Sequence, residues 1–297
     1  MTASLAHVRQ FDVTLADGRT LRGYEGGDPT GRLVVYHHGT PMSGLLRREW
    51  AEDARVREIR LVGYDRAGYG GSTRHPGRTV ADVAGDVAAL ADSLGVDRFL
   101  TWGVSGGGPH ALACAALLSD RVIAAGSVAS VAPYDASGLD FLDGMGQDNL
   151  DEFGAATEGE EGLRPYLIEQ TASLLAATPE SLRDAMASLL PEVDREALTG
   201  ETAEFLHGAM TSGLRQVCDG WLDDDLAFVA PWGFDVASIV VPLLVMQGDQ
   251  DLMVPFSHGH WLAAALTSAT VRLMAEEGHI SLFARIPEVH EWLLQQV

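Results

Sequence analysis

Residues 98–113 have the sequence RFLTWGVSGGGPHALA, which passes from a buried strand into a helix within a few residues. The first part is mostly apolar, as in a strand that is covered on both sides. The glycine-opened, alanine-rich part predicts a helix from Gly106 to about Leu118. The turn between them, Gly103-Val104-Ser105-Gly106-Gly107, has the pattern G-x-S-x-G. Because such a turn strains the serine backbone and exposes its hydroxyl beside a helix N-terminus, Ser105 is the candidate nucleophile.

Further apolar runs lie on both sides of this unit and alternate with helical patterns. Five of them predict buried strands: residues 32–39, 60–65, 122–130, 241–248 and 269–277. The stretches 7–15 and 19–25 flank Ala16-Asp17-Gly18, which is a hairpin signal. One clear helical pattern covers residues 79–95, with Thr79 as its N-cap and Gly95 at its end. The alternation predicts an α/β fold with a mainly parallel sheet covered by helices on both faces.

The alternation stops between residues 134 and 235. This span shows no clear strand pattern, whereas residues 165–178 and 180–190 have the spacing of amphipathic helices. It contains 22 Asp and Glu against 4 Arg, a net charge of 4 − 22 = −18 out of −22 for the chain. The acidic residues indicate either solvated helix faces or a cap whose acidic rim favours cationic or neutral substrates. We predict a core domain of residues 1–133 and 236–297, with residues 134–235 inserted as a helical cap.

The composition excludes several classes of partner. A net charge of −22 and a sequence pI of about 4.6 disfavour binding to phosphate backbones and anionic lipid. The first residues lack a signal-peptide pattern, no window is apolar enough to span a membrane, and the two cysteines suit a reducing compartment, so we expect a cytoplasmic protein. All 20 basic residues are arginine, and no dinucleotide, Walker or H-E-x-x-H motif occurs, so no cofactor or metal is expected. The expected partner is a small-molecule substrate, and the protein is a monomer or homodimer.

A serine needs a base to become a nucleophile at neutral pH. Among the ten histidines, only His279 follows the last predicted strand, in the loop Glu277-Gly278-His279-Ile280. Open α/β sheets build their sites at the carboxyl ends of their strands, which is where this loop should lie. We therefore predict that His279 is the general base, the alternative being an ordinary loop histidine before a helix.

The base in turn needs an acid that fixes its tautomer and stabilises the imidazolium. Asp249 and Asp251 both follow the strand at residues 241–248, and Asp135 follows the strand at residues 122–130. All three are expected at the same edge of the sheet. The residues alone do not separate these three carboxylates.

The tetrahedral intermediate requires two N–H donors aimed at its oxyanion. The residue after the nucleophile, Gly106, supplies one of them. The second should come from the loop His38-Gly39-Thr40-Pro41, where the backbone of Thr40 can point inward. We therefore predict an oxyanion hole formed by Thr40 and Gly106.

Together, these motifs resemble the α/β-hydrolase superfamily, in its capped, esterase-like serine hydrolase branch. The resemblance spans nearly the whole chain and occurs in the family order of nucleophile, acid and histidine. It rests on the segments HGTP 38–41, YDRAGYGGS 64–72, WGVSGGGPHALA 102–113, MQGDQDLMVP 246–255 and EEGHISLF 276–283. It implies that Asp251 is the acid, three residues after Gly248 and four before Pro255, with Asp249 as the alternative. It also implies that Thr40 is the second oxyanion donor and that the peptide bond before Pro41 is cis.

The nucleophile narrows the chemistry that the resemblance allows. Relatives that open epoxides or remove halides have an aspartate where this chain has Ser105, and proline iminopeptidases have a tryptophan where it has Val104. Hydrolysis of a carboxylic ester, lactone or thioester remains, and our main hypothesis is a Ser105–His279–Asp251 esterase. The alternatives are a carbon–carbon bond hydrolase acting on a diketone-like substrate and a non-catalytic ligand-binding protein. The substrate pocket should be apolar and lined by residues such as His38, Phe141, Met145, Phe205, Met210 and Trp221.

Overall fold

The strand that carries the G-x-S-x-G turn lies near the middle of an eight-stranded sheet in a computed structural model, which describes residues 8–297. The strands follow the order β1-β2-β4-β3-β5-β6-β7-β8. Their bounds are β1 Arg9–Thr14, β2 Thr20–Gly27, β3 Arg32–His37, β4 Ile59–Tyr64, β5 Phe99–Val104, β6 Val122–Val128, β7 Leu243–Gly248 and β8 Thr270–Met274. Strands β3 to β8 pair in parallel, while β2 runs antiparallel to both β1 and β4. The predicted α/β fold with a mainly parallel sheet is confirmed. The beginning of the predicted first strand, at residue 7, and residues 1–7 of the predicted core domain lie outside the described residues.

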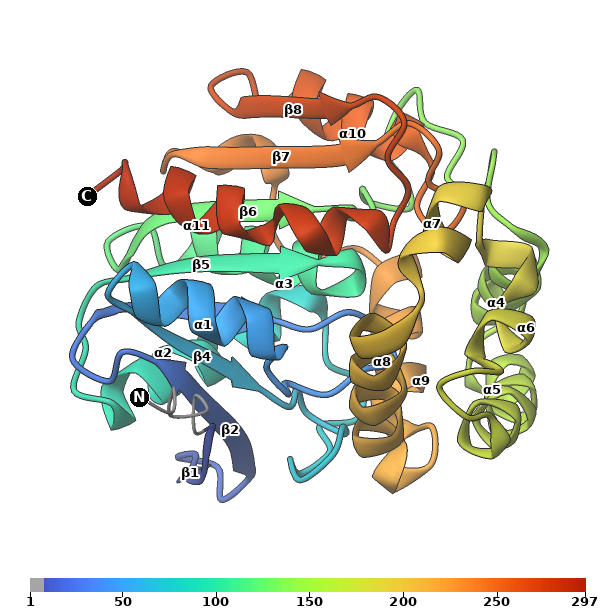
Figure 1. Cartoon of the computed structure of the whole chain (residues 1–297), viewed down its shortest axis with the longest axis horizontal. Helices are drawn as coiled ribbons and strands as arrows, with labels where there is room; N and C mark the ends of the chain where they lie inside the picture. The colour runs from blue at the N-terminus through green and yellow to red at the C-terminus, as the bar shows by residue number, and fades with distance from the viewer. Residues whose placement is uncertain (1–7) are drawn as a thin grey trace.

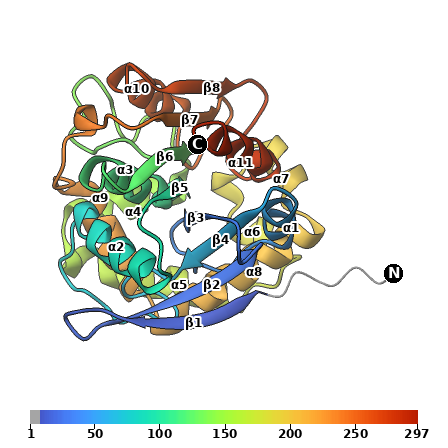
Figure 2. The ribbon, with the colours of Figure 1, turned by 90° about the vertical axis from the view of Figure 1, so that its left-hand side faces the viewer.

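Helices cover both faces of this sheet, as the apolar strands require. Figure 2 shows α1 and α11 on one face and α2, α3 and α10 on the other. Their bounds are α1 Arg48–Val56, α2 Val83–Ser93, α3 Gly108–Leu117, α10 Phe256–Ala265 and α11 Ile286–Leu294. The side chains of Thr79 and Asp82 form a capping box at the turn before α2, and Gly95 takes a positive φ of 71° after it. Both ends of this helix therefore follow the sequence prediction.

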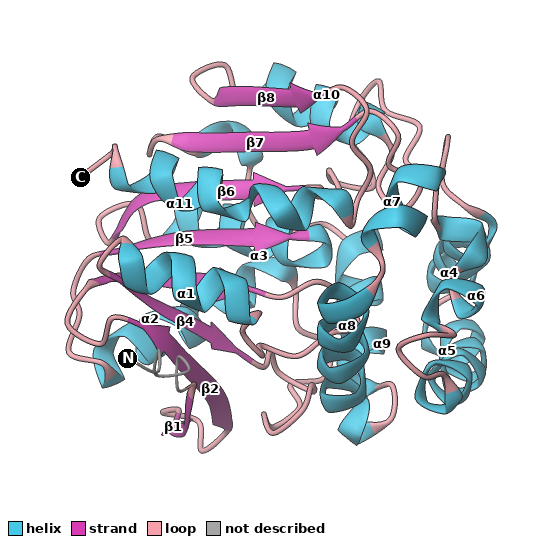
Figure 3. Cartoon of the chain, viewed as in Figure 1, coloured by secondary structure: helices cyan, strands magenta, loops and turns pink. Residues whose placement is uncertain are grey.

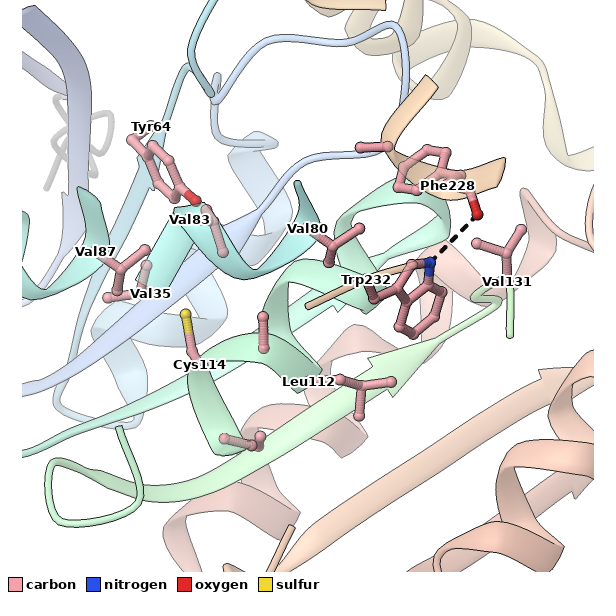
Figure 4. Close-up of a cluster of buried hydrophobic side chains, with 14 of the residues drawn as sticks. Val35, Tyr64, Val80, Val83, Val87, Leu112, Cys114, Val131, Phe228 and Trp232 are labelled. Atoms are coloured by element: carbon pink, nitrogen blue, oxygen red, sulfur yellow. Dashed lines mark hydrogen bonds between the residues drawn. The ribbon is translucent and has the colours of Figure 1, made fainter. Parts of the chain in front are cut away.

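The core on the α2–α3 face combines small and branched aliphatic side chains with several aromatic ones. Figure 4 shows Val35 from β3, Val80 and Val83 before and at the start of α2, and Leu112 from α3 in one buried cluster. Trp232 closes the cluster, and its Nε1 donates a hydrogen bond to the carbonyl oxygen of Phe228 at 3.4 Å. This cluster continues into the inserted segment, so the insertion and the sheet share one core.

The opposite face of the sheet is packed by large aromatic side chains. Tyr36 from β3, Trp102 from β5 and Trp50 from α1 have ring centroids between 4.5 and 5.4 Å apart. Each of these side chains is almost completely buried. Trp102, three residues before the candidate nucleophile, therefore belongs to the core.

Residues 134–235 form helices and loops without a strand, as Figure 3 shows. In Figure 1 these helices lie beyond the carboxyl ends of strands β5 to β7. Their bounds are α4 Gln147–Thr157, α5 Glu160–Ala176, α6 Leu182–Ala185, α7 Glu192–Ala197, α8 Gly200–Gly213 and α9 Asp219–Val229. No helix within residues 8–297 is both long enough and apolar enough to cross a lipid bilayer.

The helix predicted over residues 180–190 is wrong for most of its length. Only the four-residue helix α6 and a short 3₁₀ turn form there, and Leu190 is extended, with φ −109° and ψ 106°. Pro191 disfavours helical geometry at the preceding residue. The guanidinium of Arg195 also binds this segment, because it donates hydrogen bonds to the carbonyl oxygens of Ala187 and Leu190.

Candidate active site

Ser105 lies at a sharp turn between β5 and α3. Its φ is +54°, a left-handed conformation that strains any residue other than glycine. A Cβ atom on Gly103 would lie 2.1 Å from the carbonyl oxygen of Gly107, and one on Gly107 would lie 2.1 Å from the carbonyl oxygen of His37. The glycines of the motif are therefore required by close backbone contacts that hold the serine at the end of the strand.

A cavity of about 120 Å³ opens above this turn, between the sheet and the inserted helices. Ser105, Thr40, Gly106 and His279 all line it from the core side. These four residues come from three loops at the carboxyl ends of the strands. The structure therefore brings the candidate nucleophile, base and oxyanion residues to one cavity.

His279 is held by a carboxylate on the neighbouring loop. Its Nδ1 donates a hydrogen bond of 2.7 Å to Oδ2 of Asp251. The other oxygen of Asp251 accepts the backbone N–H groups of Met253 and Val254, each at 2.8 Å, so the carboxylate is fixed in place. A neutral ring that donates from Nδ1 has its lone pair on Nε2, the atom that a general base uses.

The electrostatic environment favours the charged form of His279. Burial alone would lower the pKa of this imidazole, but the negative charge of Asp251 and its hydrogen bond outweigh burial and raise the pKa above its ordinary value. Such an environment stabilises the imidazolium that a general base becomes when it accepts a proton.

The two other candidate acids lie elsewhere. Asp249 is exposed, and its Oδ1 accepts the backbone N–H of Glu276 at 2.9 Å. Asp135 is also exposed. Asp251 is therefore the one of these three carboxylates that contacts His279.

The two predicted oxyanion residues lie side by side in the cavity wall. A Cβ atom on Gly106 would be 2.4 Å from Oγ1 of Thr40. The Thr40–Pro41 peptide bond is cis, as the resemblance predicted. The hydroxyl of Thr40 donates to Oδ2 of Asp224 at 2.6 Å, so the side chain of Thr40 is already hydrogen-bonded within the protein.

Asp224, which the sequence analysis missed, ties this loop to the insertion. It comes from α9, is fully buried and lies between Arg66 and Arg78, with nitrogen–oxygen distances of 2.5 and 2.7 Å. The hydroxyl of Tyr69 also donates to it at 2.7 Å. Burial would raise the pKa of this carboxyl, but the two arginines hold it well below its ordinary value.

A second buried carboxylate, Asp194 on α7, holds the loop that carries the histidine. Its two oxygens accept the backbone N–H groups of His279, Ile280 and Ser281 at 2.8 to 2.9 Å. Burial raises the pKa of Asp194, while these N–H groups act in the opposite direction. Its position in an acidic, polar part of the insertion gave no local signal that could have singled it out.

The predicted pocket residues divide into two groups. Met210 from α8 and Trp221 from α9 line the cavity. The other four do not line it: His38, Phe141, Met145 and Phe205.

Each of these four side chains is engaged elsewhere. His38 is fully buried, donating from Nδ1 to the carbonyl oxygen of Gly39 and accepting the backbone N–H of Arg66. Phe141 packs behind Phe153, and Phe205 behind Phe283, both of which do face the cavity. Met145 is buried in the same core cluster as Phe141. These apolar side chains form a second row that supports the cavity wall.

No group of three His, Cys, Asp or Glu side chains with the arrangement of a metal site occurs in the described part of the chain. Both cysteines, Cys114 and Cys218, are buried and free.

Comparison with known proteins gives a consistent result. A family model described as alpha/beta hydrolase fold matches residues 32–285. A non-heme chloroperoxidase from Streptomyces lividans is 27% identical over 272 residues, covering 90% of this chain and 91% of the relative. A proline iminopeptidase from Neisseria gonorrhoeae is 26% identical over 276 residues, covering 86% of this chain and 85% of the relative. A thermophilic esterase from Thermogutta terrifontis has a similar fold, with a TM-score of 0.70 and 20% identity over 97% of this chain and 99% of that chain.

Proposed function

This chain belongs to the alpha/beta hydrolase fold family, and from that premise we propose that it is a serine hydrolase that cleaves a small, largely apolar carboxylic ester, lactone or thioester. In this proposal Ser105 is the nucleophile, His279 the general base and Asp251 the orienting acid. Residues 134–235 form the cap and the rest of the chain forms the core domain. The observation that carries the proposal is the meeting of Ser105, strained at its turn, and His279, held by Asp251, in one cavity.

The reaction would proceed through an acyl-enzyme. Oγ of Ser105 attacks the carbonyl carbon while its proton passes to Nε2 of His279. The negative charge moves to the carbonyl oxygen, where the N–H groups of Gly106 and Thr40 stabilise it. The bond to the leaving group then breaks, His279 returns the proton to the leaving alcohol, and water releases the acid by the same steps.

The side chains that line the cavity support a mainly apolar substrate. Met210, Trp221, Leu206 and Phe228 line it from the insertion, and Val131 lines it from the core. Apolar walls with a few fixed polar groups are typical of small-molecule sites. Nothing in these walls favours the diketone-like alternative over an ester.

The first test is turnover of short-chain p-nitrophenyl esters by the wild type and the variants Ser105→Ala and His279→Ala. We expect measurable turnover that falls at least about a thousandfold in either variant, because each removes a group that acts in the transition state. Labelling by a fluorophosphonate should be fast in the wild type, since only an activated serine reacts. A wild type that neither turns over any ester nor takes the label would support the non-catalytic alternative.

The assignment of the acid has a matched control two residues away. Asp251→Asn should reduce turnover by about ten-thousandfold, because the amide forces the wrong imidazole tautomer. Asp249→Asn should leave turnover within about threefold of the wild type, since the carboxylate of Asp249 is exposed and, within residues 8–297, accepts a hydrogen bond only from a backbone N–H. A larger loss in Asp249→Asn than in Asp251→Asn would overturn the assignment.

A further inference from the structure

Two carboxyl groups of the insertion meet in the wall of the cavity. Glu152 comes from α4 and Asp225 from α9, and both line the same space as Ser105. Each carboxyl shifts the pKa of the other, so the two groups lie near each other in this wall. Asp225 is 1% exposed, and its Oδ2 finds no hydrogen-bond donor among the described residues. A buried carboxylate oxygen without a donor is costly, so this position calls for a proton or a ligand.

No cation of the described chain neutralises this pair. Neither carboxyl forms an ion pair within residues 8–297, and the one side-chain donor that reaches them is Nε1 of Trp221, at 2.8 Å from Oε1 of Glu152. The nearby Arg78 is already bound to Asp224. Asp148 adds a further carboxyl to the same wall. One end of the cavity is therefore lined by carboxyl groups that have no cationic partner among the described residues.

The groups around the pair push both carboxyls towards the neutral form. Burial raises the pKa of Glu152 to about 7, and Asp148 adds to this, while the hydrogen bond from Trp221 opposes it. Burial likewise raises the pKa of Asp225, followed by the charges of Glu152 and Asp224, against a smaller opposite effect of Arg78. Both carboxyls are therefore biased towards the protonated form, and a bound cation could take the place of a proton there.

We propose that Glu152 and Asp225 bind a protonated amine of the substrate, so that the preferred substrates are esters, lactones or thioesters bearing a primary or secondary ammonium group. This proposal rests on the proposed function, because it places the ammonium in the cavity of Ser105. An ammonium supplies the donors that Asp225 lacks and the charge that neither carboxyl receives from the protein. The apolar wall between the acidic pair and the serine accommodates the rest of the molecule.

The test separates binding from hydrolysis by using the Ser105→Ala protein. We would measure by calorimetry at pH 8 the binding of n-hexylamine and of n-hexanol, which have the same chain but differ in charge. The amine should bind at least about tenfold more tightly than the alcohol, since a desolvated ion pair with hydrogen bonds is the stronger contact. At pH 7, titrations in two buffers of different ionisation heat should show that the amine displaces a proton.

Three variants in the Ser105→Ala background locate the effect. Glu152→Gln and Asp225→Asn keep the shape of the side chain, and each should abolish the preference for the amine. Asp151→Asn removes an exposed carboxyl from the same helix α4. It should leave the preference unchanged, because Asp151 does not line the cavity.

The outcomes bear on different conclusions. Equal binding of amine and alcohol by the Ser105→Ala protein, or an equal loss in Asp151→Asn, would overturn the assignment of the pair as an ammonium site. Wild-type protein at pH 5 checks the result without any change at the pair. It should show a smaller preference, because the raised pKa values of both carboxyls favour their protonated forms as the pH falls. An absence of ester turnover in the wild type would instead count against the serine hydrolase itself.

Discussion

His279 combines a raised pKa with almost complete burial, and both features come from its neighbours. Its side chain is 4% exposed, yet the charge of Asp251 overcomes the cost of burying the imidazolium. Asp194 adds a smaller contribution in the same direction. The pKa of His279 is therefore raised by two carboxylates that come from different parts of the chain.

The raised pKa of His279 predicts the pH dependence of turnover. A general base acts only when it is unprotonated, so activity falls as the pH drops below the pKa of His279. Because this pKa is raised, the acidic limb of kcat/KM should have its midpoint above pH 6.5, the ordinary value for histidine. A pH–rate profile on a neutral p-nitrophenyl ester measures it, and a midpoint below pH 6 would contradict the pairing with a charged Asp251.

The turn between β5 and α3 works because two stretches of backbone approach each other closely. Gly103 lies where any side chain would meet the carbonyl oxygen of Gly107. Gly85, in contrast, lies exposed within α2, and a Cβ atom there would meet nothing within 4 Å. The two positions differ in tertiary environment, although both are glycines in regular segments.

We expect Gly103→Ala to reduce the free energy of unfolding by about 3 kcal/mol or more, because backbone atoms cannot move aside without distorting the turn. Gly85→Ala should instead increase it by roughly 0.5–1 kcal/mol, since alanine is the better helix former. Urea denaturation followed by circular dichroism measures both changes. A Gly103→Ala protein as stable as the wild type would show that the turn has room for a Cβ atom at this position.

Helix α7 is short, but it controls the position of the loop that holds the histidine. Asp194 accepts three consecutive backbone N–H groups of that loop, and it does so across 85 to 87 residues of sequence. We regard it as a positioning residue, since it acts on the site through the backbone of His279.

Asp194→Ala should lower kcat by about 10- to 100-fold with little change in KM, because displacing a catalytic group by 1 Å or less already costs this much. It should also move the acidic limb of the pH profile to lower pH, since the charge of Asp194 helps to raise the pKa of His279. The exposed Glu192→Ala on the same helix serves as the control. An unchanged pH profile together with lost stability would indicate a purely structural role.

A buried network of ion pairs around Asp224 joins the core of the molecule to the insertion. This residue of α9 contacts Arg66 and Arg78 of the core and the hydroxyl of Thr40 in the oxyanion loop. The sequence separations of these contacts range from 146 to 184 residues. Core and insertion are therefore linked by charge as well as by a shared apolar cluster.

Asp224→Ala should reduce the free energy of unfolding by about 3–5 kcal/mol, because it leaves two arginines buried without a counter-charge. Asp219→Ala removes a carboxylate from the same helix whose side chain is 30% exposed, and it should cost at most about 1 kcal/mol. Thermal unfolding and urea titration measure both. Similar losses in the two variants would mean that the buried network contributes no more than a surface ion pair.

Much of this architecture was predictable from the chain, because its signals are local. The apolar runs predicted the strands, and the G-x-S-x-G pattern predicted the turn at Ser105, since a strand, a turn and a helix depend on residues close in sequence. The predicted helix over residues 180–190 failed where Pro191 and the guanidinium of Arg195 overrode the apolar spacing. The roles of Ser105, His279, Asp251, Thr40 and Gly106 stay predictions, although the structure places all but Asp251 in the wall of one cavity and bonds Asp251 to His279.

The amino-acid sequence by itself determined the fold class and the position of the elbow. Only the tertiary structure decided which carboxylate contacts His279, which apolar side chains face the cavity, and that Glu152 and Asp225 meet within it. The physical reason is distance along the chain: a strand is specified by its own pattern, whereas a buried carboxylate is defined by partners more than a hundred residues away, as Asp224 shows. Residue type alone cannot tell such a group from the many acidic side chains on the surface of this protein.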